Sequence, residues 1–256
     1  MPINSYDIIA DLYDTYVPAT FDIDFFVKEA KKCQGEVLEL MSGTGRVSIP
    51  LLEAGVKLTC VDLSSELNAV FARKLHQAGL HAEIVQMDVR ELALGREFDL
   101  VIIPFHSFAH LVTPADQRKA LQRIQRHVRP GGIFICTLGN PAVRSQTIDG
   151  QLRLFRRYAL PDRKGNLLLW ILEKPNPEDP HIVEAMQFFE EYDAQGLLTA
   201  RRLMELAFRL TGRDEFEQLA VQAGFKIKAF YGDYTYADFK ADSSPFMVWI
   251  LEKPGG

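Results

Sequence analysis

The sequence predicts an α/β fold in which a doubly wound, mostly parallel sheet of seven strands has helices on both faces. In the first half of the chain, short apolar runs alternate with amphipathic stretches of helical length, as expected for strands joined by helical crossovers. This pattern breaks at Gly139-Asn140-Pro141 and returns near the end of the chain. The break and the return indicate an inserted segment between the fifth and sixth strands of the main sheet.

The core elements alternate regularly between strand and helix. Predicted strands cover 37–41, 58–61, 82–86, 98–104, 133–138, 226–231 and 246–252. One predicted helix begins after Arg46, and three more cover 65–78, 113–128 and 213–223. Ser64 can cap the helix at 65–78, because its hydroxyl can accept a hydrogen bond from a free amide of the first turn. The helix at 113–128 ends before Pro130 and Gly131, which cannot continue it.

The middle of the chain has the period of an antiparallel sheet. Four strands are predicted over 151–158, 167–173, 183–192 and 202–210, with turns at Pro161-Asp162, Pro175-Asn176-Pro177 and Gln195-Gly196. The last strand alternates apolar and polar residues, which is typical of a sheet with one wet face. We therefore expect a single domain made of an N-terminal helical cap (1–34), a core (35–144), an antiparallel insert (145–211) and a return to the core (212–256).

Composition limits the class of protein. The chain has 256 residues, of which 47% are hydrophobic, so it can bury a large core. Its formal net charge is −5 and its basic residues are dispersed, so nucleic acid is not an expected partner. The first residues lack the features of a signal peptide, and no apolar run approaches the length of a membrane span. We expect a cytoplasmic protein without a membrane partner.

The spacing of cysteine and histidine predicts no metal. Cys33, Cys60 and Cys136 are too far apart for a disulfide framework or a metal cluster, and are expected to be reduced core thiols. His106 and His110 are four residues apart, but no H-E-x-x-H motif or adjacent carboxylate cluster accompanies them.

A ligand site is predicted at the carboxyl ends of the first strands. Gly43 and Gly45 follow the first strand and let the backbone approach a ligand closely. Asp62 ends the second strand, where an acid can accept hydrogen bonds from a ribose diol. The pattern implies a ligand that carries adenosine. A dinucleotide pyrophosphate fits less well, because the G-x-G-x-x-G frame ends here in Ser48.

The segment V-L-E-L-M-S-G-T-G-R at 37–46 resembles the first motif, V-L-D-L-G-C-G-T-G-R, of the class I S-adenosylmethionine-dependent methyltransferases. The resemblance covers about 37–138, and 219–253 more loosely. It implies the Rossmann-like fold of that family, in which the last two strands pair antiparallel at one side of the sheet. Met41 stands where the family usually has its first glycine.

The resemblance implies S-adenosylmethionine as methyl donor and S-adenosylhomocysteine as product. On this basis Glu39 would reach the methionine amino group directly or through water, and Gly43 and Gly45 would line the methionine and ribose. Asp62 would hold the ribose hydroxyls, with Leu63 against the adenine.

Later motifs complete the implied cofactor site. Asp88 would accept a hydrogen bond from the adenine amino group, and Pro104 and Phe105 would pass beneath the methionine. Tyr13 belongs to a Tyr-Asp-x-x-Ala-x-x-Tyr-Asp pattern similar to the cofactor-covering helix of small-molecule methyltransferases. Each acid could instead be a capping or solvated group, but the placement of all of them after successive strands favours a ligand. The predicted site comprises Tyr13, Glu39, Met41, Ser42, Gly43, Gly45, Asp62, Leu63, Met87, Asp88, Val89, Pro104 and Phe105.

His106 and His110 are the candidate catalytic bases. They follow the fourth strand, at the edge that faces the transferable methyl in the resembled family, and the ordinary pKa of histidine suits proton removal. The alternative is that His110 only satisfies a backbone carbonyl. A base is needed only if the acceptor must lose a proton, because methyl transfer depends mainly on positioning and on exclusion of water.

The charged residues of the insert are explained more simply by solvent exposure or a subunit contact than by a substrate-binding site. The pair Glu190-Glu191 is similar to the paired acids of protein arginine methyltransferases, but we interpret it as a solvated strand end. Several arginines are compatible with an acidic acceptor, although a solvated sheet face or a subunit contact explains them better. They are Arg153, Arg156, Arg157, Arg201, Arg202 and Arg209.

Together these features predict a methyltransferase that acts on a small molecule. The insert is similar to those of sugar-amine and glycine-type N-methyltransferases, where it covers the pocket or joins subunits. That similarity favours nitrogen weakly over oxygen and allows a homodimer through the insert. Two alternatives stay open: an NAD-dependent oxidoreductase, which Ser48 and the terminal strand pair disfavour, and a non-catalytic S-adenosylmethionine-binding protein.

Overall fold

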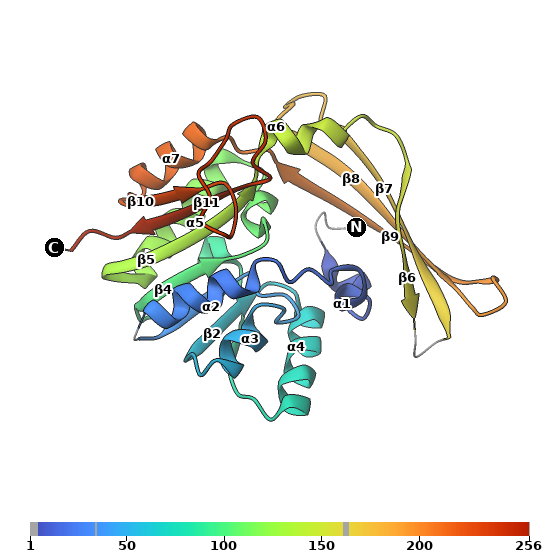
Figure 1. Ribbon diagram of the computed structural model, residues 1–256, viewed down its shortest axis with the longest axis horizontal. Coiled ribbons are helices and arrows are strands. Elements are labelled where there is room, and N and C mark those ends of the chain that lie inside the picture. The colour runs from blue at the N-terminus through green and yellow to red at the C-terminus, as the bar shows by residue number, and fades with distance from the viewer. Residues whose placement is uncertain (1–4, 34, 161–163, 256) are drawn as a thin grey trace.

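The main sheet places the carboxyl ends of its parallel strands at one edge. In the computed structural model, which describes residues 5–33, 35–160 and 164–255, seven strands have the order β10-β11-β5-β4-β1-β2-β3 (Figure 1). The parallel strands are β1 (Val37–Leu40), β2 (Leu58–Asp62), β3 (Glu83–Gln86), β4 (Phe98–Ile103) and β5 (Val128–Gly139). β11 (Phe246–Glu252) is antiparallel to both β5 and β10 (Lys226–Tyr231). The predicted doubly wound sheet with an antiparallel terminal pair is confirmed.

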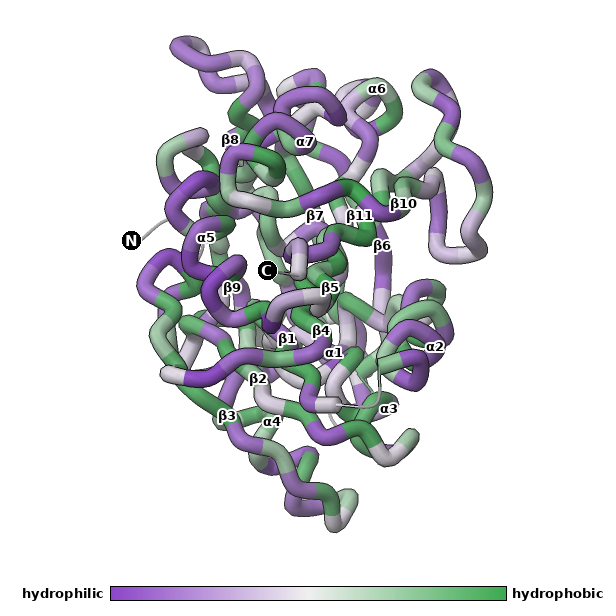
Figure 2. Tube along the Cα trace, turned by 90° about the vertical axis from the view of Figure 1, so that its left-hand side faces the viewer, coloured by the Kyte–Doolittle hydropathy of each residue, from purple (hydrophilic) through white to green (hydrophobic). Residues whose placement is uncertain are grey.

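Helices cover both faces of this sheet. α2 (Ile23–Lys32), α3 (Ser48–Glu53) and α4 (Ser65–Ala78) contribute apolar side chains to one core cluster, and α5 (Pro114–His127) and α7 (Arg213–Gln222) contribute to the other. Figure 2 shows hydrophobic residues along β4 and β5 in the middle of the molecule and hydrophilic residues on α5 and α7. The predicted cap is confirmed, because the Ser64 hydroxyl accepts a 3.0 Å hydrogen bond from the Leu67 amide.

The insert forms a second, antiparallel sheet. Its four strands in the described ranges are β6 (Arg153–Leu160), β7 (Gly165–Pro175), β8 (Ile182–Tyr192) and β9 (Leu198–Arg209), paired in chain order. The predicted antiparallel insert is confirmed, although β9 begins earlier than expected. The predicted turn at Pro161-Asp162 lies outside the described residues.

The N-terminal segment lies between the two sheets (Figure 1). It comprises a 3₁₀ turn (Tyr6–Ile9) and the short helix α1 (Tyr13–Tyr16). Ile9 and Leu12 are buried in a third apolar cluster with side chains of β7, β8 and β9. The Tyr158 hydroxyl on β6 donates a 3.0 Å hydrogen bond to the carbonyl of Tyr16. These contacts hold the segment against the inner face of the insert sheet.

Short helical turns follow three strands of the main sheet. Residues Val89–Glu91 follow β3, Ser107–His110 follow β4, and α6 (Pro141–Arg144) with the turn Ser145–Thr147 follows β5. None of the helices in the described ranges combines the length and the apolar character needed to cross a bilayer.

The structure differs from the prediction at the start of β5. The strand begins at Val128 instead of 133, whereas Pro130 and Gly131 were expected only to end the preceding helix. The ladder to β4 is irregular there, since Phe98 pairs with Val128 but Leu100 pairs with Ile133. The Gly131 amide donates a 2.8 Å hydrogen bond to the carbonyl of Lys253. Gly131 has a φ of 76°, in the left-handed region, so the strand carries an irregularity here and continues through it by this pairing.

Candidate active site

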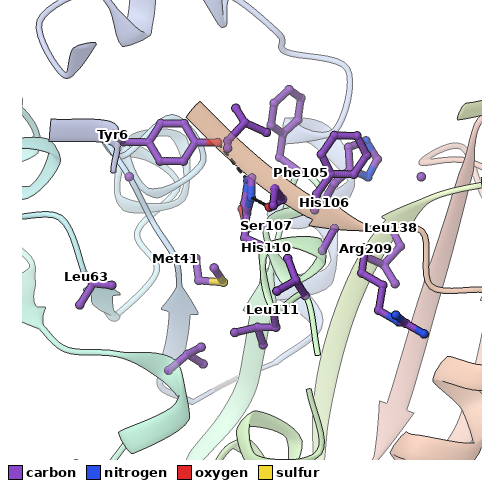
Figure 3. A pocket seen from close by; sticks show the side chains of 18 of the residues that line it. Tyr6, Met41, Leu63, Phe105, His106, Ser107, His110, Leu111, Leu138 and Arg209 are labelled. Carbon is purple, nitrogen blue, oxygen red and sulfur yellow. Dashed lines mark hydrogen bonds between the residues drawn. The ribbon is translucent and has the colours of Figure 1, made fainter. Parts of the chain in front are cut away.

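A cavity of about 880 Å³ lies where the carboxyl ends of the main-sheet strands face the insert. Residues that follow β1, β2, β3, β4 and β5 line one side, and the N-terminal segment and the strand β9 line the other. Figure 3 shows Met41 and Leu63 at one end and His106, Leu138 and His110 toward the other. The cavity thus connects the predicted cofactor residues with the predicted catalytic histidines.

The loop after β1 bends sharply at the cavity wall. Met41, Gly43 and Gly45 have φ values of 57°, 57° and 80°, in the left-handed region that favours glycine. A Cβ on Gly43 would meet no atom within 4 Å, whereas a Cβ on Gly45 would lie 2.2 Å from the Phe71 ring. Gly43 therefore leaves space beside the loop, and Gly45 lets the loop pack on α4.

Asp62 fixes this loop to the tip of β2. Its carboxylate accepts a 2.7 Å hydrogen bond from the Gly43 amide and a 2.9 Å bond from the Ser64 amide. The side chain is 9% exposed and lines the cavity. Burial raises the pKa of Asp62, and the backbone amides oppose that rise. Leu63 beside it is 62% exposed, so an apolar face at the cavity rim is available to a planar ligand.

Most of the predicted cofactor residues meet in the cavity. The residues that line it are Tyr13, Met41, Gly43, Asp62, Leu63, Met87, Asp88, Val89 and Phe105. The structure places Glu39, Ser42, Gly45 and Pro104 behind this surface. The Ser42 hydroxyl is buried without a hydrogen-bond partner among the described residues. A role in cofactor binding stays a prediction for each of these residues.

Asp88 and Glu39 have partners within the protein. The guanidinium of Arg90 donates to both carboxylate oxygens of Asp88, at 2.6 to 3.0 Å, and these hydrogen bonds lower the pKa of Asp88. Glu39 is 2% exposed and accepts a 2.7 Å hydrogen bond from Ser48. Burial raises the pKa of Glu39 to about 8. Its predicted contact with a methionine amino group, direct or through water, stays a prediction.

A buried ion pair connects the glycine loop with the start of α2. The guanidinium of Arg46 binds both oxygens of the Asp22 carboxylate, at 2.6 and 2.7 Å, and Asp22 is fully buried. The same guanidinium lies 4.5 Å from the centre of the Phe105 ring. Sequence reasoning did not predict this pair, because the two residues are 24 positions apart in elements of different type.

His106 occupies a constrained position after β4. Phe105 and His106 both have positive φ values, of 55° and 64°, which are uncommon for residues with a side chain. The His106 ring is stacked on Phe246, with ring centres 5.2 Å apart. Its Nδ1 atom is buried and lacks a hydrogen-bond partner within the described chain. Burial, with a smaller contribution from Arg144, lowers the pKa of His106 to about 4, so the ring is neutral at pH 7.

His110 is held from two sides. Its Nδ1 lies 3.3 Å from the carbonyl oxygen of Ala207, and its Nε2 lies 3.0 Å from the Tyr6 hydroxyl (Figure 3). A carbonyl only accepts, so Nδ1 donates and the neutral ring accepts the Tyr6 proton at Nε2. Burial lowers the pKa of His110. The hypothesis that His110 satisfies a backbone carbonyl agrees with this geometry, and the ring also lines the cavity.

Residues of α6 and of the insert complete the wall near His106. Arg144 forms an ion pair with Glu173 of β7, and its guanidinium lies 5.0 Å from the centre of the Phe208 ring. Gln187 of β8 also lines the cavity, and its side-chain oxygen is buried without a partner in the described ranges. Only the tertiary fold brings these residues to the carboxyl ends of β4 and β5. The sequence carried no motif that could have identified them.

Two interpretations of insert charges are wrong. Glu191 is not a solvated strand end: it is 3% exposed and forms a 3.1 Å ion pair with Arg202. Arg209 is 7% exposed and binds Asp179 and Glu215, so it does not belong to a solvated face. In Figure 3 its guanidinium points away from Tyr6 and His110. Buried ion pairing explains these charges, and alternation along a strand could not reveal it.

Cysteines and acids form no cluster of three metal-ligating side chains within residues 5–33, 35–160 and 164–255. All three cysteines are free thiols. Cys60 and Cys136 are buried as expected, whereas Cys33 is only partly buried. Cys33, which follows α2, packs against a core cluster without being fully enclosed by it.

Comparisons with known proteins agree with the geometry. Residues 37–132 match the family model of a methyltransferase domain. A glycine/sarcosine N-methyltransferase of Parasynechococcus marenigrum (strain WH8102) is 28% identical over 245 residues, which cover 94% of this chain and 80% of that protein. A dTDP-3-amino-3,6-dideoxy-alpha-D-glucopyranose N,N-dimethyltransferase of Streptomyces fradiae is 29% identical over 135 residues, or 50% of this chain and 51% of that protein.

The fold of the whole chain has a counterpart among solved structures. An S-adenosylmethionine-dependent methyltransferase from Clostridium acetobutylicum ATCC 824 matches with a TM-score of 0.82 at 20% identity, covering 98% of this chain and 99% of that chain. The match over residues 37–132 shows a methyltransferase domain, and the fold and the glycine turn are similar to those of S-adenosylmethionine-dependent methyltransferases. These matches give no support to an NAD-dependent oxidoreductase or to a non-catalytic binding protein.

The cavity fits the methyl donor of this class, S-adenosylmethionine. Space beside Gly43 allows a ligand to approach the backbone, and the carboxylate of Asp62 faces the cavity from the tip of β2. The exposed side chain of Leu63 offers an apolar surface next to that carboxylate. A volume of about 880 Å³ leaves room for an acceptor beside a nucleoside-sized molecule.

Proposed function

We propose that this methyltransferase transfers the methyl group of S-adenosylmethionine to a nitrogen of a small-molecule acceptor. The observation that carries the proposal is one continuous cavity that joins the Asp62 side of the sheet to the neutral rings of His106 and His110. The nitrogen preference is supported by the two N-methyltransferases to which the chain is similar.

On the donor side, the chain supplies binding and orientation. We assign the ribose hydroxyls to Asp62, the adenine face to Leu63 and the close backbone approach to Gly43. When bound, the donor supplies an electrophilic methyl group on a positively charged sulfur. The loop of Gly43 is held by Asp62 and Arg46 before any ligand arrives, so little ordering is required on binding.

On the acceptor side, we assign His106 to orientation instead of proton removal. A pKa of about 4 makes the ring a weak base that stays uncharged near neutral pH, so it can orient an acceptor by contact without taking up its proton. A neutral amine already carries the lone pair that attacks, so it needs placement more than deprotonation. The stacked rings of Phe105 and Phe246 hold the His106 ring at a fixed angle and exclude water.

Calorimetry and a product assay test this function. We expect S-adenosylhomocysteine to bind the purified protein and NAD not to bind. With S-adenosylmethionine present, release of S-adenosylhomocysteine should depend on an added amine, tested with glycine, sarcosine and dTDP-3-amino sugars against their hydroxyl counterparts. Binding of NAD alone would end the proposal, and turnover restricted to the hydroxyl compounds would reassign the acceptor atom to oxygen.

A homodimer through the insert is a separate part of the proposal. β6 is an edge strand of the insert sheet, and its Leu154 and Phe155 are 46% and 59% exposed. Light scattering should give the mass of a dimer, and Phe155→Glu should convert it to the monomer. A monomeric wild-type protein contradicts this part without affecting the catalytic one. The cytoplasmic location stays a prediction.

A further inference from the structure

The carboxylate of Asp88 lies beside the tip of β2. In the ladder between β2 and β3, Asp62 pairs with Gln86, and the Met87 amide donates a 3.1 Å hydrogen bond to the Asp62 carbonyl. The chain then turns at Asp88, which caps the 3₁₀ turn Val89–Glu91. The Asp88 side chain is 21% exposed and lines the cavity. Asp62 and Asp88 thus face the same end of the cavity from neighbouring strands.

Within the described residues, Arg90 supplies the hydrogen bonds that the Asp88 carboxylate receives. Its backbone amide donates to Oδ1 at 2.8 Å, its Nε lies 3.0 Å from each oxygen, and its Nη2 donates to Oδ2 at 2.6 Å. A carboxylate has about four acceptor positions. Because the N–H groups of Arg90 use all but about one of them, Asp88 can accept about one more hydrogen bond, on a side chain that lines the cavity.

Arg90 is itself held from α5. Its Nη1 lies 3.3 Å from the carboxylate of Asp116, in the first turn of this helix, and the Asp116 amide donates a 3.0 Å hydrogen bond to the Thr113 hydroxyl. The guanidinium thus lies between two carboxylates and cannot rotate away from Asp88 without losing both ion pairs. The Asp88 carboxylate is therefore held in one orientation before any ligand binds.

A carboxylate held in this way accepts hydrogen bonds and cannot donate them. The hydrogen bonds from Arg90 lower the pKa of Asp88, so the group is ionised near neutral pH. An amino group at the six position of a purine offers the N–H that such an acceptor requires. A purine with an oxo group at this position presents a second acceptor instead, and two acceptors in contact repel each other.

We propose that Arg90 is a positioning residue, which fixes Asp88 so that its remaining acceptor position selects a methyl donor with an amino group at the six position of the purine. The inference rests on the proposed function and extends it to the recognition of the donor's base. Arg90 acts through Asp88 and needs no contact with the ligand. Without Arg90, the carboxylate would rotate and bind water, and the ligand would have to order it at a cost in affinity.

Calorimetric titration with two ligands of equal charge tests this role. S-adenosylhomocysteine carries the six-amino purine, and S-inosylhomocysteine carries the six-oxo purine. We expect the wild type to bind S-adenosylhomocysteine at least about tenfold more tightly, as a hydrogen bond to a charged group gives. In Arg90→Met this preference should fall to about threefold or less, through weaker binding of S-adenosylhomocysteine. An unchanged preference in Arg90→Met overturns the proposal.

Arg96→Met is the matched control. Arg96 also has a half-exposed guanidinium, paired with Glu83 at the other end of β3, and it does not line the cavity. This variant should keep the preference of the wild type. A loss of preference equal to that of Arg90→Met would show a general effect of disturbing β3 and would overturn the proposal.

A conservative variant covers the case in which Arg90→Met does not fold, which circular dichroism would show. Arg90→Lys keeps the positive charge but replaces the planar guanidinium with a single ammonium group. Its preference should lie between those of the wild type and Arg90→Met. A preference equal to that of the wild type would show that charge alone is sufficient and would overturn the positioning role.

Asp88→Asn tests the residue through which Arg90 acts. An amide can donate as well as accept, so it can bind either purine, and the preference should fall to about one. If Asp88→Asn discriminates as well as the wild type does, another residue reads the base, and the proposal is wrong.

The outcomes distinguish the two levels of inference. A wild-type protein that binds neither ligand refutes the proposed function and this inference together. A wild-type protein that binds both ligands equally well refutes the inference only, because binding of the donor's product is then established and the amine-dependent assay still tests the transfer.

Discussion

The Tyr6 hydroxyl donates a hydrogen bond to Nε2 of His110 across 3.0 Å, although the two residues are 104 positions apart. Ala207 sets the direction of this bond, because its carbonyl requires the proton of His110 to be on Nδ1. The neutral ring and its tautomer are therefore determined by two elements, the N-terminal segment and β9. His110 can change its state only if one of them moves.

This arrangement predicts the behaviour of Tyr6→Phe. Nitrogen-15 NMR should find the Nδ1–H tautomer of His110 in the wild type. Removal of the hydroxyl takes a donor from the neutral ring, so the pKa of His110 should rise in the variant. Tyr13→Phe is the control, because the Tyr13 ring meets Tyr6 edge-on, at 6.0 Å between ring centres. A Nε2–H tautomer in the wild type would contradict the assignment.

Asp62→Ala should weaken the binding of S-adenosylhomocysteine. The substitution removes the acceptor assigned to the ribose hydroxyls and also frees the Gly43 amide, so we expect a loss of roughly 1 to 3 kcal/mol in calorimetry. Asp233→Ala is the matched control: Asp233 also accepts two backbone amides, from Thr235 and Ala237, but does not line the cavity. An unchanged dissociation constant for Asp62→Ala would remove Asp62 from the site.

The buried carboxyl of Glu39 predicts a pH dependence of stability. The unfolded chain releases this proton near its ordinary pKa of 4.5, whereas the folded protein keeps it up to about pH 8. The folded state then binds more protons in this window, so Glu39 contributes stability below pH 4.5 that is lost as the pH rises toward 8. Urea unfolding of Glu39→Gln, which cannot ionise, should show a smaller decline between pH 5 and 8. Parallel curves for the two proteins would count against a raised pKa.

The Arg46–Asp22 pair should matter more for stability than any surface pair. Arg46→Met leaves a fully buried carboxylate without its partner, which should lower the free energy of unfolding by about 3 to 5 kcal/mol. The combined change Arg46→Met with Asp22→Leu should recover part of that loss. Arg213→Met breaks a half-exposed pair with Glu217 and should cost less than about 1 kcal/mol. Similar losses of unfolding free energy in Arg46→Met and Arg213→Met would refute the predicted difference between the buried and the exposed ion pair.

Local patterns predicted the regular elements well. The helix Ser65–Ala78 and the strands Lys226–Tyr231 and Phe246–Glu252 have the predicted bounds, because their caps, periods and flanking turns agree with one another. The start of β5 was not predictable from Pro130 and Gly131, since backbone hydrogen bonds between Lys253 and the two glycines Gly131 and Gly132 hold that segment in the sheet. Tertiary pairing there outweighs the local preference for a turn.

The candidate site was predictable where it follows the parallel strands. Asp62 and His106 could be placed because the carboxyl ends of such strands meet at one edge. Gln187 and Arg144 could not, because their position depends on how the insert sheet docks against the core. Sequence patterns describe each sheet by itself and say little about the interface between them.

The hydrogen bonds that hold the N-terminal segment in place affect the rate of product release. Asp14 accepts hydrogen bonds from Thr44 and Lys74, Arg202 holds the carbonyl of Ile8, and Tyr158 holds the carbonyl of Tyr16. The segment lines one wall of the cavity, so opening these contacts would widen the route by which a nucleoside product leaves. The residence time of the product can therefore change without a change in its affinity. A substitution of Arg202, which is remote from every reacting atom, would accelerate product release and so alter the turnover rate.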